Sequence, residues 1–118
     1  MRRIAVLALL LAAFACGRAE RDRARDEATL RTQLTAMRTA IAAFTKAHGH
    51  GPATLREAMP VVPIDPLTHS ATWRLTTEET VQFDEFTTGS AIARRSAIVD
   101  VHSGAAGRDG SGRPYSEY

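Results

Sequence analysis

Cysteine is almost absent from this chain, and its scarcity bounds how the protein can be stabilised. The 118 residues include a single cysteine, Cys16, so no disulfide can form within the chain. Small exported domains are often cross-linked by disulfides because they bury little apolar surface. This chain must therefore be held together by side-chain packing around one core.

Neither sign of charge is in excess. Lys and Arg total 15 against 13 Asp and Glu, and two of the basic residues, Arg2 and Arg3, lie in a segment that we expect to be removed. Without them the net charge is zero. A neutral domain with no basic stripe interleaved with aromatic residues lacks the electrostatic footprint of a nucleic-acid-binding protein. We therefore expect no nucleic-acid partner.

Recognisable catalytic motifs are also missing. No serine lies in the strand-turn-helix context of a nucleophile elbow. The glycine-rich stretch 104–112 follows a predicted strand but opens no helix, so it is not a phosphate-binding loop. Adjacent acids such as Glu78 and Glu79 are typical of a solvated turn. The sequence thus predicts a non-catalytic protein without a cofactor, with a small hydrolase as the less favoured alternative.

The chain has no apolar run of the length that crosses a bilayer. Residues 4–15 are apolar throughout, but a spanning helix needs about 20 such residues. The run follows Met1, Arg2 and Arg3 and is followed at once by Cys16 and Gly17, which is the pattern of a signal peptide. We predict a signal peptide at 1–15.

The position of Cys16 indicates lipid attachment. The cysteine stands at the end of the apolar run between Ala15 and Gly17, which resembles the lipobox of bacterial lipoproteins, where the thiol is diacylated and becomes the new N-terminus. Ala13 stands where a lipobox favours leucine, so an ordinary signal peptide with an accidental cysteine is the alternative. Lipidation would make residues 16–28 a charged tether and anchor residues 29–118 to a membrane of the cell envelope, facing the periplasm or the exterior.

One apolar stripe organises the folded part. Within residues 29–46, apolar side chains recur at steps of four and three, which places them on one face of a helix; they are Leu30, Leu34, Met37, Ile41 and Phe44. Residues 18–27 carry eight charges of both signs. They fit either a solvated helical lead-in or a disordered tether.

Glycine and proline residues in the middle of the chain predict where the helices end. Gly49 and Pro52 predict the end of the long helix. Thr54 and Glu57 fit a capping box at the start of a short second helix. Three prolines after Met59 predict an extended crossover at 61–67. His48 and His50 lie two residues apart without further ligands nearby, so we interpret them as surface histidines rather than a metal pair.

Alternating apolar residues predict three short antiparallel strands in the second half. The side chains that share a face are Ala71, Trp73 and Leu75; Val81 and Phe83; and Ala97, Val99 and Val101. Thr77 and Glu78 are expected to form the first turn, and residues 87–96 the second connection. The fold class is α+β, with Leu34, Ile41 and Phe44 expected to pack against Trp73, Val81, Phe83 and Val99.

The order of these motifs resembles the soluble domain of the major pseudopilins of bacterial type II secretion, the protein G family. The sequence GHGPATL at 49–55 is similar to the family's Gly-x-x-Pro-x-x-Leu element, and VPIDPLT at 62–68 to its x-Pro-x-Asp-Pro element. The C-terminal sequences VDVHSG at 99–104 and DG at 109–110 are also similar. The likeness covers about residues 30–118 and implies a long N-terminal helix on a small three-stranded sheet.

Two departures from the family bear on function. The prepilin N-terminus, whose long apolar helix builds the filament core, is replaced by Cys16 and the charged tract. The family commonly binds calcium in the loop after its last strand, and here Asp100 and Asp109 are weak candidates, with Ser111 and Glu117 as helpers. Surface recognition is expected at Arg94, Arg95, Arg108 and Tyr115.

The resemblance implies a lipid-anchored structural or interaction protein associated with type II secretion or a related pilus machine. Its expected partners are the membrane, through Cys16, and pseudopilins or other secretion-machine proteins. The alternative is a free-standing structural lipoprotein of the cell envelope that uses the same fold.

Overall fold

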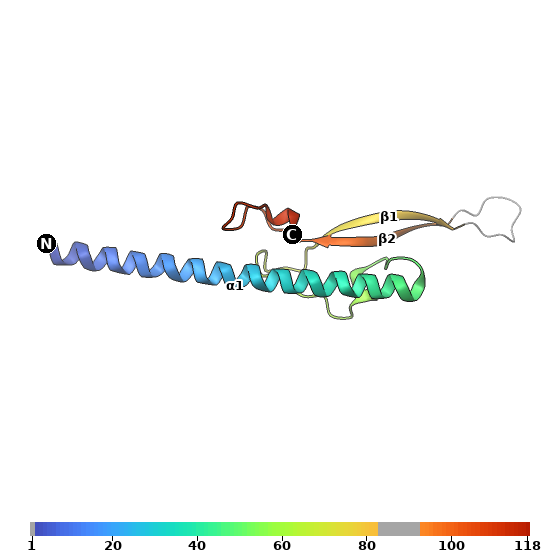
Figure 1. Cartoon of the computed structure of the whole chain (residues 1–118), viewed down its shortest axis with the longest axis horizontal. Helices are drawn as coiled ribbons and strands as arrows, with labels where there is room; N and C mark the ends of the chain where they lie inside the picture. Colours follow the sequence, from blue (N-terminus) through green and yellow to red (C-terminus); the bar gives the residue numbers. More distant parts are fainter. Residues whose placement is uncertain (1, 83–92) are drawn as a thin grey trace, which may run out of the picture.

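One long helix is the scaffold against which the other elements of the molecule pack. The computed structural model describes residues 2–82 and 93–118, with side chains described for 11–79 and 95–118. Helix α1 (Arg2–His48) runs nearly the full length of an elongated chain that measures 89 × 21 × 21 Å. The short helix α2 (Leu55–Ala58), a ribbon of strands β1 (Arg74–Gln82) and β2 (Ala93–His102), and the C-terminal tail lie beside its C-terminal half (Figure 1).

The apolar run, the charged tract and the apolar stripe are continuous parts of α1. The charged residues 18–27 are therefore a helical lead-in, the first of the two possibilities that the sequence left open. The helix ends as predicted: His48 is its last residue, and Gly49 has a φ of +76° that only glycine adopts readily.

The stripe on α1 forms one side of the core, as predicted. Four of its five members are nearly inaccessible to solvent: Leu30, Leu34, Met37 and Ile41. The exception is Phe44, which is only partly buried; its ring stacks on His48 with 4.0 Å between ring centroids. The other side of the core is formed by Trp73, Ile98, Val101, Tyr115 and Tyr118.

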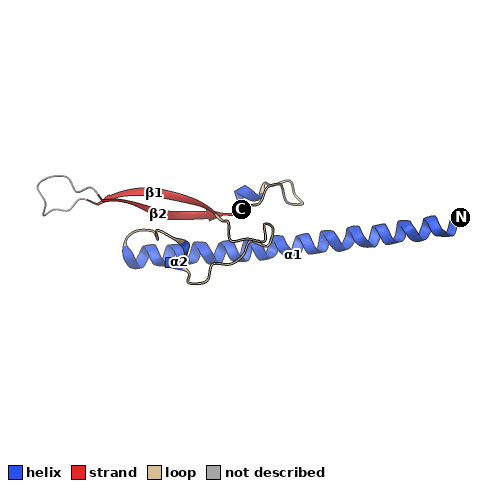
Figure 2. Cartoon of the chain, turned by 180° about the vertical axis from the view of Figure 1, so that it is seen from behind, coloured by secondary structure: helices blue, strands red, loops and turns tan. Residues whose placement is uncertain are grey.

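Two strands, rather than three, are present in the described residues (Figure 2). The first two predicted strands are one, because β1 continues through Thr77 and Glu78 without a turn. Residues 76–80 contain no Gly, Pro, Asn or Asp, the residues that a tight hairpin requires, whereas threonine favours extended backbone. The connection expected at 87–96 is shorter at its C-terminal end, since β2 already begins at Ala93. Phe83 lies outside the described residues.

A β-bulge changes which side chains of β2 face the core. Thr76 pairs with Asp100 and Thr77 with Ile98, so Val99 has no partner on β1. Ala97 and Val101 are buried as expected, but Val99 is 41% exposed and Ile98 is buried in its place. The amide of Ile98 donates to the carbonyl oxygen of Pro52 at 2.8 Å. The bulge thus connects β2 to the loop that follows α1.

The close approach of β2 to the loop after α1 explains why residue 51 is glycine. A Cβ atom at this position would lie within 2.3 Å of the Ile98 carbonyl oxygen, so only glycine permits the approach. The capping box is formed in part: Glu57 accepts from the amide of Ala53 at 2.9 Å, one residue earlier than expected, while Thr54 makes no side-chain cap.

Candidate interaction surfaces

The C-terminal tail is part of the core rather than a loose loop. Residues 104–118 fold back along α1 and end in the short 3-10 helix η1 (Tyr115–Glu117). Tyr115 is 1% exposed, and its ring meets that of Tyr118 edge-on at 5.6 Å. Tyr115 was expected at an interaction surface, and that expectation is wrong because its ring is buried within the chain.

A buried hydrogen bond fixes Tyr115 on α1. Its hydroxyl donates to Glu27 Oε1 at 2.7 Å, and Arg23 Nε donates to the same hydroxyl at 3.1 Å. Burial raises the pKa of Tyr115, and the bond to Glu27 raises it further because it favours the protonated phenol. The last part of the charged tract therefore serves as a docking site for the chain's own tail.

Asp109 organises the tail loop. One carboxylate oxygen accepts from the Ser111 amide at 2.8 Å, from its hydroxyl at 2.7 Å and from the Arg113 amide at 2.9 Å. The other accepts from the Tyr118 hydroxyl at 2.5 Å. The Tyr118 hydroxyl, followed by that of Ser111, holds the pKa of Asp109 well below its ordinary value of 3.8. Both oxygens that calcium would use thus bind protein donors.

The low pKa of Asp109 predicts acid sensitivity. The ionised carboxylate stabilises the folded chain above about pH 4, and this contribution is lost as the pH falls toward the lower folded-state pKa. In Asp109→Asn the difference in melting temperature from wild type should therefore be largest at neutral pH and shrink below pH 4. Glu117→Gln, which removes an exposed carboxylate from the same tail, is the matched control. A difference that stays constant from pH 7 to pH 3 would contradict this role.

Asp100 belongs to a separate cluster around Arg38. Arg38 Nε donates to Asp100 Oδ1 at 2.8 Å, and Arg38 Nη2 donates to the main-chain oxygens of Val101 at 2.9 Å and Tyr118 at 2.6 Å. His102 completes the cluster, with Nδ1 at 2.7 Å from that Tyr118 oxygen and Nε2 at 3.3 Å from Asp100. Partial burial, the largest single effect, raises the pKa of Asp100, but the Arg38 hydrogen bond, the Val101 amide and the charges of Arg38 and His102 together lower it below its ordinary value.

The two calcium candidates therefore do not meet in one site. Within residues 2–82 and 93–118, no three His, Cys, Asp or Glu side chains gather as a metal site would require. Asp100 instead attaches β2 to α1, and Asp109 attaches the tail loop to Tyr118.

The remaining interaction candidates lie at different ends of the packed domain. Arg95 is exposed near the end of α1, with Nη1 at 3.3 Å from His50 Nε2. Arg108 is exposed in the tail loop and donates to the Gly112 carbonyl at 2.9 Å. The side chain of Arg94 lies outside the described residues. The structure thus does not bring Arg95 and Arg108 into one patch.

An apolar groove that sequence reasoning missed lies between α2 and β1. It encloses about 650 Å³, and Val61 and Leu75 in its wall are 81% and 44% exposed. The indole nitrogen of Trp73 donates to Pro63 at 2.9 Å, which holds the groove's floor in place. Because large apolar side chains are exposed together here, with Thr54 and Arg56 beside them, we take the groove as a candidate contact site for another protein. The other lining residues are Ala53, Thr54, Leu55, Arg56, Pro60, Val62 and Ala71.

Cys16 is exposed on the part of α1 that extends beyond the packed domain. Glu27 is the first buried residue along α1 from position 11, about 16 Å further along the helix axis at 1.5 Å per residue. Among the described residues, no helix has a stretch long and apolar enough to cross a membrane.

Comparisons of the chain with protein-family profiles, with curated protein sequences and with solved structures gave no match.

Proposed function

We propose that this chain is a lipid-anchored, non-catalytic interaction protein that acts beside a type II secretion or related pilus machine. The observation that carries the proposal is the projection of α1 beyond the packed domain, with Cys16 exposed on it. A lipid at Cys16 would hold the tail and core roughly 16 Å from the membrane surface. The projecting helix would act as the spacer.

The charge of this spacer argues for a place beside a filament rather than within it. A pseudopilin-like subunit would bury its N-terminal helix in the filament core. Residues 18–27 carry eight charges, and burying them without partners would cost far more than a small domain's total stability. Arg18, Arg21 and Arg25 are all exposed, so their charges remain solvated in the single chain.

The buried polar residues support a structural role. Asp65 is fully buried, yet it accepts from the Ser103 hydroxyl at 2.6 Å and from the Leu67 amide at 2.8 Å, which closes the crossover loop. Glu27 likewise accepts a hydrogen bond from the hydroxyl of Tyr115. These carboxylates stabilise the fold through their hydrogen bonds, and the apolar groove provides the contact surface.

The proposal predicts membrane release on Cys16→Ser. Mass spectrometry of the mature wild-type N-terminus should show an acylated cysteine, and the variant should move from the membrane to the soluble fraction. Single cysteines placed at Val61 in the groove and at Arg108 in the tail loop should then crosslink to secretion-machine proteins in membranes. Lys46→Cys, exposed near the end of α1, is the control.

The outcomes separate the alternatives. An unmodified Cys16 on a soluble mature chain would overturn the anchor. Acylation without crosslinks at either position, together with intact secretion in a deletion strain, would leave a free-standing envelope lipoprotein. Equal crosslinking at Lys46, Val61 and Arg108 would indicate proximity without a specific surface.

A further inference from the structure

The projecting part of α1 has two different faces. Leu11, Phe14, Arg18, Arg21 and Arg25 follow one another at steps of three and four, so they lie along one side of the helix. Five of the six residues lining a shallow depression of about 530 Å³ belong to this side or flank it: Phe14, Ala15, Arg18, Arg21 and Arg25; the sixth is Asp22. We call Arg18, Arg21 and Arg25 the arginine face.

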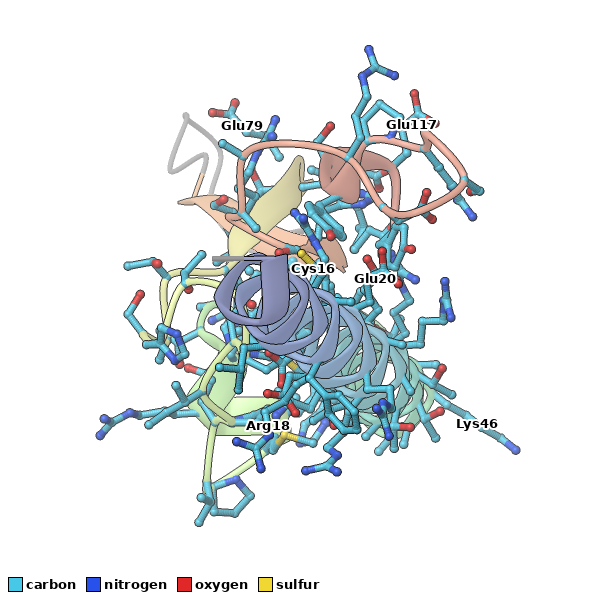
Figure 3. The ribbon with its side chains drawn as sticks, turned by 90° about the vertical axis from the view of Figure 1, so that its left-hand side faces the viewer. Cys16, Arg18, Glu20, Lys46, Glu79 and Glu117 are labelled. Atoms are coloured by element: carbon cyan, nitrogen blue, oxygen red, sulfur yellow. The ribbon has the colours of Figure 1, made fainter. Side chains whose placement is uncertain are left out.

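The opposite side of the helix faces the tail. Glu20, Arg23 and Glu27 line a depression together with Arg108 and Asp109 of the tail loop. Figure 3 shows Arg18 on the side of α1 away from Cys16 and Glu20. Arg21 and Arg25 lie on the same side of the helix as Arg18, so the arginine face lies across α1 from the described residues of the tail loop.

Positive and negative charges that cancel in the linear sequence therefore lie on different sides of the helix. Residues 18–27 contain four arginines and four acids. Glu20 and Glu27 point to the tail side, where Glu27 is occupied by Tyr115. Asp22 is the acid that shares the depression with the three outward arginines. Asp26 follows Asp22 by one helical turn, so the outer side carries three arginines against two acids, a net positive charge.

The chemistry of this face fits phosphate groups. Guanidinium groups bind phosphate oxygens through paired hydrogen bonds. Arg21 Nε already donates to the Gly17 carbonyl at 3.1 Å, which holds the side chain along the helix. Leu11 and Phe14 belong to the signal peptide that we expect to be removed, so in the anchored chain this face begins at Arg18, two residues after Cys16. On a lipid-anchored chain the nearest phosphates are those of the lipid headgroups, and a basic patch beside the acylated cysteine is a typical second attachment to an anionic membrane surface.

We propose that the arginine face binds the phosphate groups of anionic phospholipids. The inference rests on the proposed anchor at Cys16, which would place these arginines at the membrane. Arg21 and Arg25 lie about 7.5 and 13.5 Å along the axis from Cys16, and the headgroup layer is roughly 5 to 7 Å thick on each side of a bilayer. Arg18 and Arg21 reach it from an upright helix. Arg25 reaches it when the helix tilts toward its arginine face, which keeps the tail side away from the membrane.

The test measures vesicle partitioning of the mature chain, residues 16–118, made by cell-free synthesis, where no acylation occurs; leaving out the apolar run 4–15 removes its own affinity for vesicles. Vesicles of phosphatidylcholine alone are compared with vesicles that also contain phosphatidylglycerol. The wild-type chain should prefer the anionic vesicles on the order of 10- to 100-fold at low salt. The triple variant Arg18→Gln, Arg21→Gln, Arg25→Gln should lose most of this preference. The matched control, Lys46→Gln, Arg56→Gln, Arg74→Gln, removes the same charge from exposed positions of the packed domain and should keep it.

Several outcomes would overturn the inference. An equal loss in both triple variants would mean that net charge alone attracts the chain to the vesicles. An unchanged preference in the arginine-face variant would show that these residues do not contact lipid. Binding of a short DNA duplex that depends on the same arginines, without a vesicle preference, would assign the face to nucleic acid. Because the chain is not acylated in this assay, the result is independent of the test of Cys16 in cells.

Discussion

Replacing Leu34 with alanine is expected to lower the free energy of unfolding by about 2 to 5 kcal/mol. Leu34 is 2% exposed in the middle of the stripe and belongs to the core cluster shared with Ile98 and Val101. The substitution removes buried apolar surface and leaves a cavity between rigid elements. For a domain of this size, each kcal/mol corresponds to a shift in melting temperature of roughly 4 to 8 °C. Denaturant unfolding followed by circular dichroism measures the change.

Phe44→Ala is the matched comparison, since Phe44 ends the same stripe. Sequence periodicity alone predicts an equal loss at both positions. The partly buried ring of Phe44 stacks on His48 and does not belong to the core cluster of the described residues, so we expect a clearly smaller loss there. Equal effects of the two substitutions would mean that the end of α1 is as tightly packed as its middle, contrary to the structure.

Replacing Tyr115 with alanine is expected to cost about 3 to 5 kcal/mol, in the range for a large aromatic core residue. The ring is buried against Tyr118, and its hydroxyl satisfies the buried Glu27. Loss of the ring should also release residues 104–118 from α1. Limited trypsin digestion should then cut after Arg108 faster than in wild type, at a temperature where the core remains folded; the bond after Arg113 precedes Pro114 and resists trypsin in any case.

Tyr115→Phe separates the ring from the hydroxyl. Phenylalanine keeps the packing but leaves the Glu27 carboxylate without its donor, which should cost about 1 to 3 kcal/mol. The tail should stay docked and resist trypsin. Unchanged trypsin resistance in Tyr115→Ala would contradict the assignment of this residue as the contact that holds the tail.

Local patterns predicted the helical half of the protein well. Leu30, Leu34, Met37 and Ile41 are buried as their spacing predicted, because a helix places every third or fourth residue on one side whatever it packs against. Gly49 ends the helix for an equally local reason, its positive φ. Short strands are less certain, since a residue such as Thr77 can extend a strand or join a turn depending on its partner strand.

The candidate surfaces were predicted less well than the fold. Arg108 is exposed as expected, but Tyr115 is buried because it joins the core cluster that includes Leu30 and donates a hydrogen bond to Glu27 of α1. Nothing in the amino-acid sequence around Val61 distinguishes it from its neighbour Val62. The first is 81% exposed, while the second packs against the core.

The sequence by itself determined the long helix, its buried stripe and its end, since each depends on residues within a few positions of one another. It also set the order of charges in residues 18–27. Only the tertiary structure decided that Val99 bulges outward, that the tail docks through Tyr115 and Tyr118, and that an apolar groove stays open beside Trp73. These features depend on contacts between residues far apart in the chain, so the identity of one partner does not determine them until the backbone has brought both together.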